Sequence, residues 1–259
     1  MLKRFFIINI GTELLIGRTI NGNLQWLGYK IYTNGGQILG AMIVHDKYEE
    51  ISKALNYACS TEAEAVITTG GLGPTYDDIT MEAVAKWLNR ELYLNEDALS
   101  FMRRLRPPQS EESKKAYEKM AKLPEGSIPL FNYVGVAPGA LIYCEDKRIY
   151  VLPGVPREMK DIFERYIEPY IGERTGKGIV MIIEGLYEAQ LSPMITSLSK
   201  SYPTVYVKSH PSISMGKSVV RIEAWTQDQS VDLIKIYDAV EKFVKEKGGT
   251  IKLKEPNEE

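Results

Sequence analysis

A short run of apolar residues opens the chain and ends at a glycine. It spans residues 5–11 (FFIINIG) and shows no alternation of polar and apolar positions. Such a run predicts a strand that is buried on both faces, as in a parallel sheet. Two further strand-like runs follow at residues 37–44 (QILGAMIV) and 65–71 (AVITTGG), and helical patterns separate the three runs at residues 21–31 and 47–60. This succession predicts a three-layer α/β domain with a mainly parallel sheet.

The remainder of the chain extends this domain and then adds a smaller one. The expected elements are a helix (77–90), a mostly helical segment broken by a proline pair (91–122) and a hairpin that leads into a final helix (139–155). A polar, glycine-rich stretch, GERTGKG, near residues 172–178 marks a boundary. The predicted domains are therefore residues 1–172 and residues 178–259, the second being a small α+β domain of two layers.

The composition argues against several classes of protein. The formal net charge is −2 at pH 7, so no overall basic field favours nucleic acid as a partner. No apolar stretch reaches the roughly 18–20 residues of a membrane span, so we expect no membrane partner. Cys59 and Cys144 lie far apart and lack the spacing of a metal site, which favours a reducing compartment. We therefore expect a cytoplasmic protein.

The segment TTGGLGPTYDDIT (residues 68–80) joins the third predicted strand to a predicted helix. Gly70, Gly71 and Gly73 would let backbone N–H groups approach an anion closely, and a helix N-terminus favours negative charge. The same glycines could equally serve only the geometry of a tight turn. The position matters, since ligands of such α/β sheets bind beyond the carboxyl ends of the strands.

Two adjacent acidic residues distinguish this loop from an ordinary turn. Thr75 and Asp78 have the spacing of a helix N-terminal cap, so Asp78 has a structural explanation. Asp77 has no such explanation from the sequence alone. Two carboxylates that face one pocket repel each other, and a divalent cation such as Mg²⁺, held together with substrate phosphate, would relieve the repulsion. Asp77 and Asp78 are therefore the candidate metal ligands.

Polar residues also follow the first predicted strand. Glu13 lies two residues beyond Gly11, where it could cap a helix, bind ribose hydroxyls or bind a metal. Asn21 and Asn23 could be turn formers, or they could read hydroxyls or a base. His45 and His210 have no ligand-type spacing to other residues, and we expect both to be structural or exposed.

Six stretches of the sequence carry a resemblance to a known family. They are GTELLIGRTINGN (11–23), TTGGLGPTYDDIT (68–80), LPEGS (123–127), Asn132, GVAPG (135–139) and LPGVPREM (152–159). Together they resemble the N-terminal region of the CinA (competence/damage-inducible protein A) family over about residues 1–165. The resemblance implies the three-layer fold shared by the molybdenum-cofactor-biosynthesis proteins MogA, MoaB and MoeA, with a nucleotide- or pterin-binding cleft at the carboxyl edge of the sheet.

The resemblance also implies an activity. Within the CinA-like branch, it implies a metal-dependent pyrophosphatase that acts on ADP-ribose or a related nucleotide, with Mg²⁺ or Co²⁺ as its cofactor. Asp77, Asp78 and Lys119 would be catalytic, with both aspartates at the metal and Lys119 on a phosphate. The substrate-binding residues would be Gly11, Glu13, Asn23, Gly70, Gly71, Gly73, Thr75, Asn132, Pro153 and Gly154.

Three departures from the family qualify these expectations. The chain is too short to hold the C-terminal nicotinamide-mononucleotide amidase domain of longer members, so we expect no amidase activity. Met120 and Val136 replace a glutamine and a threonine that are usual in the family, which bears on the substrate contacts. Residues 178–259 resemble the small KH-like domain of CinA, but they show no convincing GxxG loop, so RNA binding does not follow.

Two other functions stay open at this point. The glycine loop could hold the phosphate of a pterin, in a molybdopterin-binding or adenylylating protein. The chain could also sense a nucleotide without turnover. Because related proteins assemble through this fold, we expect a homo-oligomer and favour a dimer.

Overall fold

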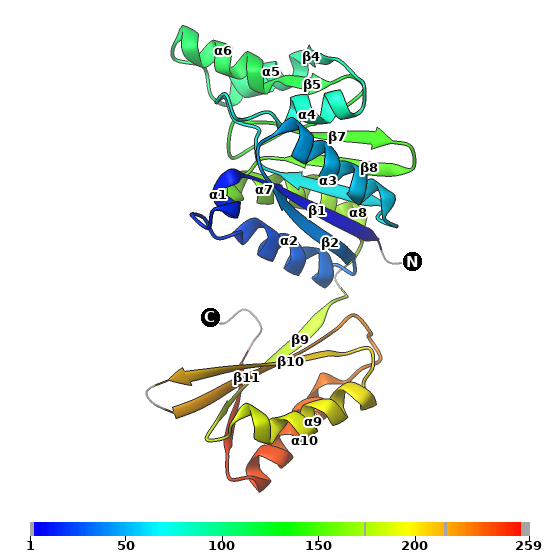
Figure 1. Cartoon of the computed structure of the whole chain (residues 1–259), viewed down its shortest axis with the longest axis vertical. Coiled ribbons are helices and arrows are strands. Elements are labelled where there is room, and N and C mark those ends of the chain that lie inside the picture. Colours follow the sequence, from blue (N-terminus) through cyan, green and yellow to red (C-terminus); the bar gives the residue numbers. More distant parts are fainter. Residues whose placement is uncertain (1–2, 174, 215–216, 255–259) are drawn as a thin grey trace. The chain divides into compact units, whose positions relative to one another are not determined.

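The computed structural model describes residues 3–173, 175–214 and 217–254. Two compact units make up the chain, Met1–Glu173 and Arg174–Glu259, and they divide within the glycine-rich stretch near residues 172–178 (Figure 1). No helix in the described ranges is long and apolar enough to cross a membrane.

A six-stranded sheet forms the middle layer of the first unit. In the order β2–β1–β3–β8–β7–β6, its strands are Gln37–Val44, Arg4–Ile10, Ala65–Thr69, Lys147–Leu152, Gly139–Cys144 and Ile128–Leu130. The first four strands run parallel, whereas β7 pairs antiparallel with both β8 and β6. The mainly parallel sheet and the hairpin of β7 and β8 confirm the predictions from the sequence.

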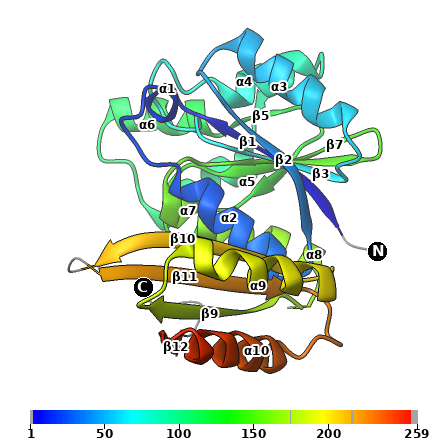
Figure 2. The same ribbon diagram turned by 60° about the horizontal axis from the view of Figure 1, so that its bottom comes forward.

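Helices cover both faces of this sheet (Figure 2). On one face lie α2 (Gly22–Thr33) and α7 (Pro156–Ile162), and on the other lie α3 (Tyr48–Ser60) and α4 (Thr80–Trp87). Phe5 and Phe6 show why β1 lacks polar alternation, since these neighbouring side chains pack into opposite helix layers. The predicted three-layer α/β fold is therefore confirmed.

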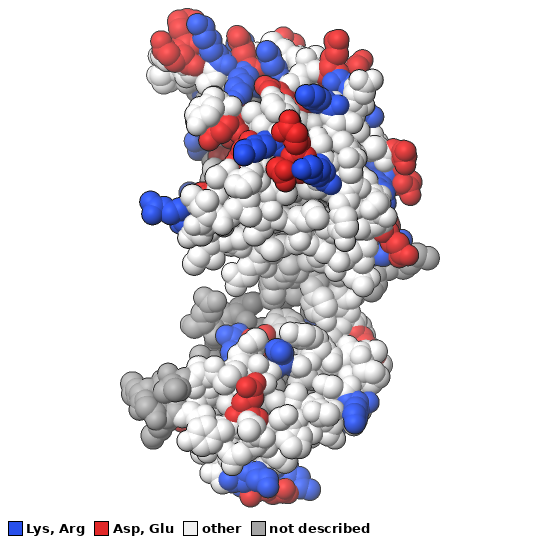
Figure 3. Space-filling model, viewed as in Figure 1, with Lys and Arg blue, Asp and Glu red and all other residues white. Residues whose placement is uncertain are grey.

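The other elements of the first unit are short or lie at its edge. They are α1 (Thr12–Leu15), β4 (Leu92–Leu94), α5 (Glu96–Leu105), α6 (Glu111–Met120), β5 (Lys122–Pro124), the π-helical turn η1 (Phe163–Ile167) and α8 (Glu168–Ile171). The proline pair at residues 107–108 separates α5 from α6, as the sequence predicts. Basic and acidic side chains are interspersed over the face of this unit that Figure 3 shows.

The helix predicted over residues 77–90 begins later than the sequence pattern indicates. α4 starts at Thr80, so Asp77 and Asp78 lie in the loop before it. The carboxylate of Asp78 accepts hydrogen bonds from the backbone N–H and the hydroxyl of Thr75, at 2.9 and 2.6 Å. Such local side-chain bonds compete with helix formation, and here they hold a turn instead. The predicted helix cap at Thr75 is therefore wrong, although the Thr75–Asp78 bond that it requires is present.

The second unit has two layers. Its antiparallel sheet has the order β10–β11–β9–β12, with strands Tyr206–Ser214, Lys217–Thr226, Lys177–Glu184 and Thr250–Lys254. Both of its helices, α9 (Glu188–Ser201) and α10 (Leu233–Glu246), contribute to one core that includes Met181, Ile222 and Val240. The predicted small α+β domain is confirmed.

Close contact between neighbouring strand ends requires a glycine after β3. Gly70 has a φ of +109°, and a Cβ built on it would lie 2.0 Å from the carbonyl oxygen of Ile10, the last residue of β1. The N–H group of Gly70 donates to the carbonyl of Leu152, the last residue of β8, at 3.0 Å. Gly70 thus joins the ends of three parallel strands, where an L-side chain has neither the space nor the backbone geometry it needs.

We predict that Gly70→Ala lowers the free energy of unfolding by at least about 3 kcal/mol, because the added methyl group must displace the backbone of β1. Guanidinium titration followed by circular dichroism measures this loss. Gly17→Ala is the matched control, since Gly17 also has a positive φ (+70°) but nothing within 4 Å of the added Cβ. That variant should lose only about 1–2 kcal/mol. Equal losses in the two variants would contradict the steric argument.

Candidate functional site

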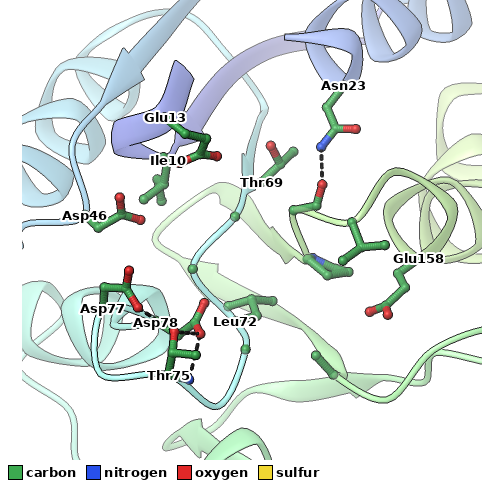
Figure 4. Close-up of a pocket in the computed structure, with 18 of the residues that line it drawn as sticks. Ile10, Glu13, Asn23, Asp46, Thr69, Leu72, Thr75, Asp77, Asp78 and Glu158 are labelled. Atoms are coloured by element: carbon green, nitrogen blue, oxygen red, sulfur yellow. Dashed lines mark hydrogen bonds between the residues drawn. The ribbon is translucent and has the colours of Figure 1, made fainter. Parts of the chain in front are cut away.

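A cleft of about 680 Å³ opens at the carboxyl edge of the parallel strands. The residues that follow four of these strands line it: Gly11 after β1, Asp46 after β2, Gly70 after β3 and Pro153 after β8. This is the edge at which α/β sheets bind their ligands. Figure 4 shows Asp46 and Asp77 on one side of the cleft and Glu158 on the other.

The structure brings together all but two of the predicted site residues. Those that line the cleft are Gly11, Glu13, Asn23, Gly70, Gly71, Gly73, Thr75, Asp77, Asp78, Pro153 and Gly154. Lys119 and Asn132 are not among the lining residues. Asp46 and Glu158 line the cleft although the sequence analysis does not single them out. A signal was present for each: Asp46 closely follows a strand, as Glu13 does, and Glu158 stands inside LPGVPREM.

The loop between β3 and α4 offers three consecutive backbone donors. The N–H groups of Gly71, Leu72 and Gly73 have no hydrogen-bond partner in the described part of the chain, and all three residues line the cleft. Thr80 fixes the start of this loop, because its hydroxyl donates to the carbonyl of Gly70 at 2.8 Å and its N–H donates to the carbonyl of Gly71 at 3.1 Å. A run of unoccupied N–H groups before a helix is suited to binding an anion.

Asp77 is exposed on the same loop. The hydroxyl of Thr75, which contacts Asp78, also donates to the carboxylate of Asp77. This hydrogen bond is the main reason why the pKa of Asp77 lies below its usual value. Asp77 is therefore ionised throughout the neutral range. The sequence alone offers no structural explanation for Asp77. The hydrogen bond from Thr75 corrects that expectation.

Lys119 of α6 contacts the loop between β3 and α4. Its ammonium donates to the carbonyl oxygen of Thr75, which ties the loop to α6. Lys119 also lines a separate cavity of about 20 Å³, together with Gly73 and Asp78. The structure thus gives Lys119 a role in supporting the loop, and its contact with a phosphate stays a prediction.

Asn132 is buried and uses its whole amide to fix residues 132–137. Its Oδ1 accepts from the N–H groups of Val134 and Gly135, at 3.2 and 2.8 Å. Its Nδ2 donates to the carbonyl of Ala137 and to Oε2 of Glu158, at 3.0 and 2.7 Å. These four bonds fill the hydrogen-bonding capacity of a primary amide. Asn132 thus positions two lining residues, whereas the sequence analysis assigns it a direct contact with substrate.

The N-terminus of α2 forms the wall beside the turn after β8. Asn21 Oδ1 caps this helix by accepting from the N–H of Leu24 at 3.0 Å, and Asn23 Nδ2 donates to the carbonyl of Gly154 at 2.8 Å. Both amides therefore have structural roles. Within the described ranges, Asn21 Nδ2 and Asn23 Oδ1 are buried without a partner, so one polar atom of each amide remains unsatisfied.

The cleft is acidic. The carboxylates that line it belong to Glu13, Asp46, Asp77, Asp78 and Glu158, and its described lining includes no Lys, Arg or His. Asp46 is partly engaged, since its Oδ2 accepts from the N–H and the hydroxyl of Thr12, at 2.8 and 3.0 Å. Across the described residues, no group of three Asp, Glu, His or Cys side chains could hold a metal ion. A divalent cation in the cleft would therefore need phosphate and water to complete its coordination, as Mg²⁺ commonly does.

Comparisons with known proteins connect the first unit to a family. Residues 6–173 match the family model described as "Probable molybdopterin binding domain". A protein of Aeropyrum pernix is 40% identical over 258 residues, which cover 96% of each chain. A protein of Pyrobaculum arsenaticum is 40% identical over 246 residues, which cover 91% of this chain and 92% of the other.

A solved structure also supports a relation to a known family. The crystal structure of CinA from Thermoplasma acidophilum matches with a TM-score of 0.60 and 35% identity, over 66% of this chain and 98% of that chain. The relation to CinA that the sequence motifs imply is thereby confirmed. The chain belongs to the molybdopterin-binding-domain family, and its first unit is a CinA-family N-terminal region.

Proposed function

We propose that the cleft binds a ligand that carries a pyrophosphate group and a planar ring. We further propose that the protein hydrolyses the pyrophosphate bond of a nucleotide such as ADP-ribose or a related dinucleotide. The N–H groups of residues 71–73, which have no partner among the described residues, carry this proposal. They stand between a strand and a helix at the ligand edge of the sheet, and such donors bind phosphate without a basic side chain.

The carboxylates around these donors require a cation if a phosphate is to bind. Asp77 and Asp78 belong to the same loop as the donors, and ionised carboxylates are the oxygen ligands that Mg²⁺ prefers. These two carboxylates would supply part of the coordination of a divalent ion, either Mg²⁺ or Co²⁺, and phosphate and water would supply the rest. When bound, such an ion polarises a phosphoryl oxygen and lowers the pKa of a bound water. Without it, five lining carboxylates would oppose an anionic ligand.

Thr75 and Lys119 would hold the two aspartates ready for this task. The hydroxyl of Thr75 contacts both carboxylates, and the ammonium of Lys119 binds the carbonyl of Thr75. The loop is therefore held before any ligand enters. Preorganised polar groups stabilise developing charge more than groups that must first rearrange.

We predict that Asp77→Asn lowers cation-stimulated hydrolysis of ADP-ribose at least about 100-fold, because the neutral amide is a poor ligand for a hard cation. The melting temperature should change little, since Asp77 is exposed. Product AMP, measured by chromatography with and without Mg²⁺, gives the rate.

Asp146→Asn is the control for this variant. Asp146 is exposed in the turn between β7 and β8 and does not line the cleft. Its substitution should leave the rate unchanged. An Asp77→Asn protein as active as the parent would refute the assigned role of Asp77.

Binding of a pterin phosphate is a second candidate function, as in a molybdopterin-binding or adenylylating protein. The family match over residues 6–173 favours it. The donors of residues 71–73 would then hold the phosphate of the pterin, and hydrolysis would not be required.

A ligand panel separates the two candidates. The protein is incubated with ADP-ribose, NAD or molybdopterin, with Mg²⁺ or Co²⁺ and with EDTA. We expect the protein to produce AMP from ADP-ribose with Mg²⁺ or Co²⁺ and to produce none in EDTA, because the cation offsets the negative charge of the cleft. Retained molybdopterin without AMP would favour the second candidate, and bound ADP-ribose without AMP would indicate a nucleotide sensor. Undiminished turnover in EDTA would refute the dependence on a cation.

A further inference from the structure

The two cysteines of the chain lie outside the cleft, each at the end of an element. Cys59 is the last residue but one of α3, and Cys144 is the last residue of β7. Both are free thiols, both are partly buried, and both pack against the core cluster between the sheet and helices α3 and α4. Neither lines the cleft, so the proposed hydrolysis gives them no task.

Lys147 joins the end of α3 to the turn that follows Cys144. In the antiparallel pair of β7 and β8, Lys147 stands directly opposite Cys144. Its ammonium donates to the carbonyl oxygens of Thr61 and Ala63, at 3.0 and 2.7 Å, and these residues lie just beyond the end of α3. Residues directly opposite each other on neighbouring strands have their side chains on the same face of the sheet. The side chain of Cys144 therefore points into the layer in which α3 ends.

The electrostatics of Cys59 also place the two sulfur atoms close together. Burial, the largest effect, raises the pKa of the Cys59 thiol to about 11, and the charge of a Cys144 thiolate raises it next. This charge acts on Cys59 more strongly than the charges of the adjoining turn residues, which are Glu145, Asp146 and Lys147. Because Coulomb energy falls with distance, Cys144 is a near neighbour of Cys59. Burial raises the pKa of Cys144 as well, so both thiols are uncharged at neutral pH and do not repel each other.

We propose that Cys59 and Cys144 form a redox-active pair that closes to a disulfide bond when a low-molecular-weight disulfide, such as glutathione disulfide, is the oxidant. The thiolate of one cysteine attacks the oxidant, and one glutathione leaves. The thiolate of the other cysteine then attacks the mixed disulfide, and the second glutathione leaves. The cysteines lose two electrons and two protons, and the two glutathione thiols gain them. Under the reducing conditions that the sequence analysis favours, the reverse exchange restores the two packed thiols.

The bond would connect α3 to β7 and close residues 59–144 into a loop. A link across a long loop restricts the unfolded chain more than the folded chain, so it stabilises the fold. The coupling is reciprocal, and folding therefore favours the bond by the same free energy. We expect oxidation to raise the melting temperature by at least about 5 °C. We also expect the bond to be at least about 100-fold more favourable in the folded chain than in the unfolded chain.

Equilibration of the full chain with glutathione buffers tests the pairing. The chain, folded or in concentrated guanidinium, is held at mildly alkaline pH with set ratios of glutathione to glutathione disulfide, because exchange is faster there. Alkylation traps the products, and mass spectrometry identifies them. Since the chain has two cysteines, an intramolecular disulfide can only join Cys59 to Cys144. The ratio at which half of the chain is oxidised gives the effective concentration of one thiol for the other.

Three outcomes would overturn the proposal. They are glutathione adducts or disulfide-linked dimers as the only oxidised products of the folded chain, equal effective concentrations in the folded and unfolded chains, and a melting temperature that falls on oxidation. Cys59→Ser and Cys144→Ser are controls for the melting temperature, which should not rise in either variant. None of these measurements uses ADP-ribose, so the result is independent of the proposed hydrolysis.

Lys147→Met tests the contact that aligns the two thiols. The effective concentration in the folded chain should fall at least about threefold, because the end of α3 is no longer tied to the turn. Lys53→Met is the matched control, since Lys53 is exposed on α3 and pairs only with Glu50 among the described ion pairs. It should leave the value unchanged. An unchanged value in Lys147→Met would contradict the alignment by Lys147, and the comparison of the folded and unfolded parent chains would still decide the pairing.

Discussion

The cleft depends on three parallel strand ends that meet at Gly70. Its N–H binds the end of β8, and the space where a side chain would begin holds the carbonyl oxygen of Ile10 at the end of β1. Because no side chain separates these strand ends, the loops that follow them start close together. One cavity is therefore lined by the loop of residues 71–73, the segment with Glu13 and the turn at Gly154.

Much of this arrangement could be predicted from the sequence. Apolar runs without alternation identify buried parallel strands, and such strands place their carboxyl ends at one edge of the sheet. The residues that follow the strands, such as Gly11 and Asp77, are consequently brought together whatever the details of the helices. The small second domain was also predictable, because its helical and strand patterns are long and regular.

The errors arise where a few specific contacts outweigh the pattern. α4 starts later than the sequence pattern predicts because Thr75 and Asp78 bind each other and hold a turn. The helical spacing of apolar residues does not reveal this competition between turn and helix. Asn132 and Lys119 have partners far away in the chain, Glu158 and Thr75. Their supporting roles depend on tertiary contacts that no local motif reveals. Asp46 and Glu158 each carry a local signal, but many residues follow strands or lie within motifs, and only the cleft shows that these two line it.

The hydrogen bond between Lys119 and Thr75 determines which amino-acid substitutions can alter this site. The loop carries the motif residues, yet one of its supports comes from α6, which lies outside the motif. Substitutions within α6 can therefore shift Asp77 and Asp78 without altering the loop sequence. Proteins that share TTGGLGPTYDDIT letter for letter would then differ in ligand affinity through a helix that both supports the loop and contributes to the cleft lining.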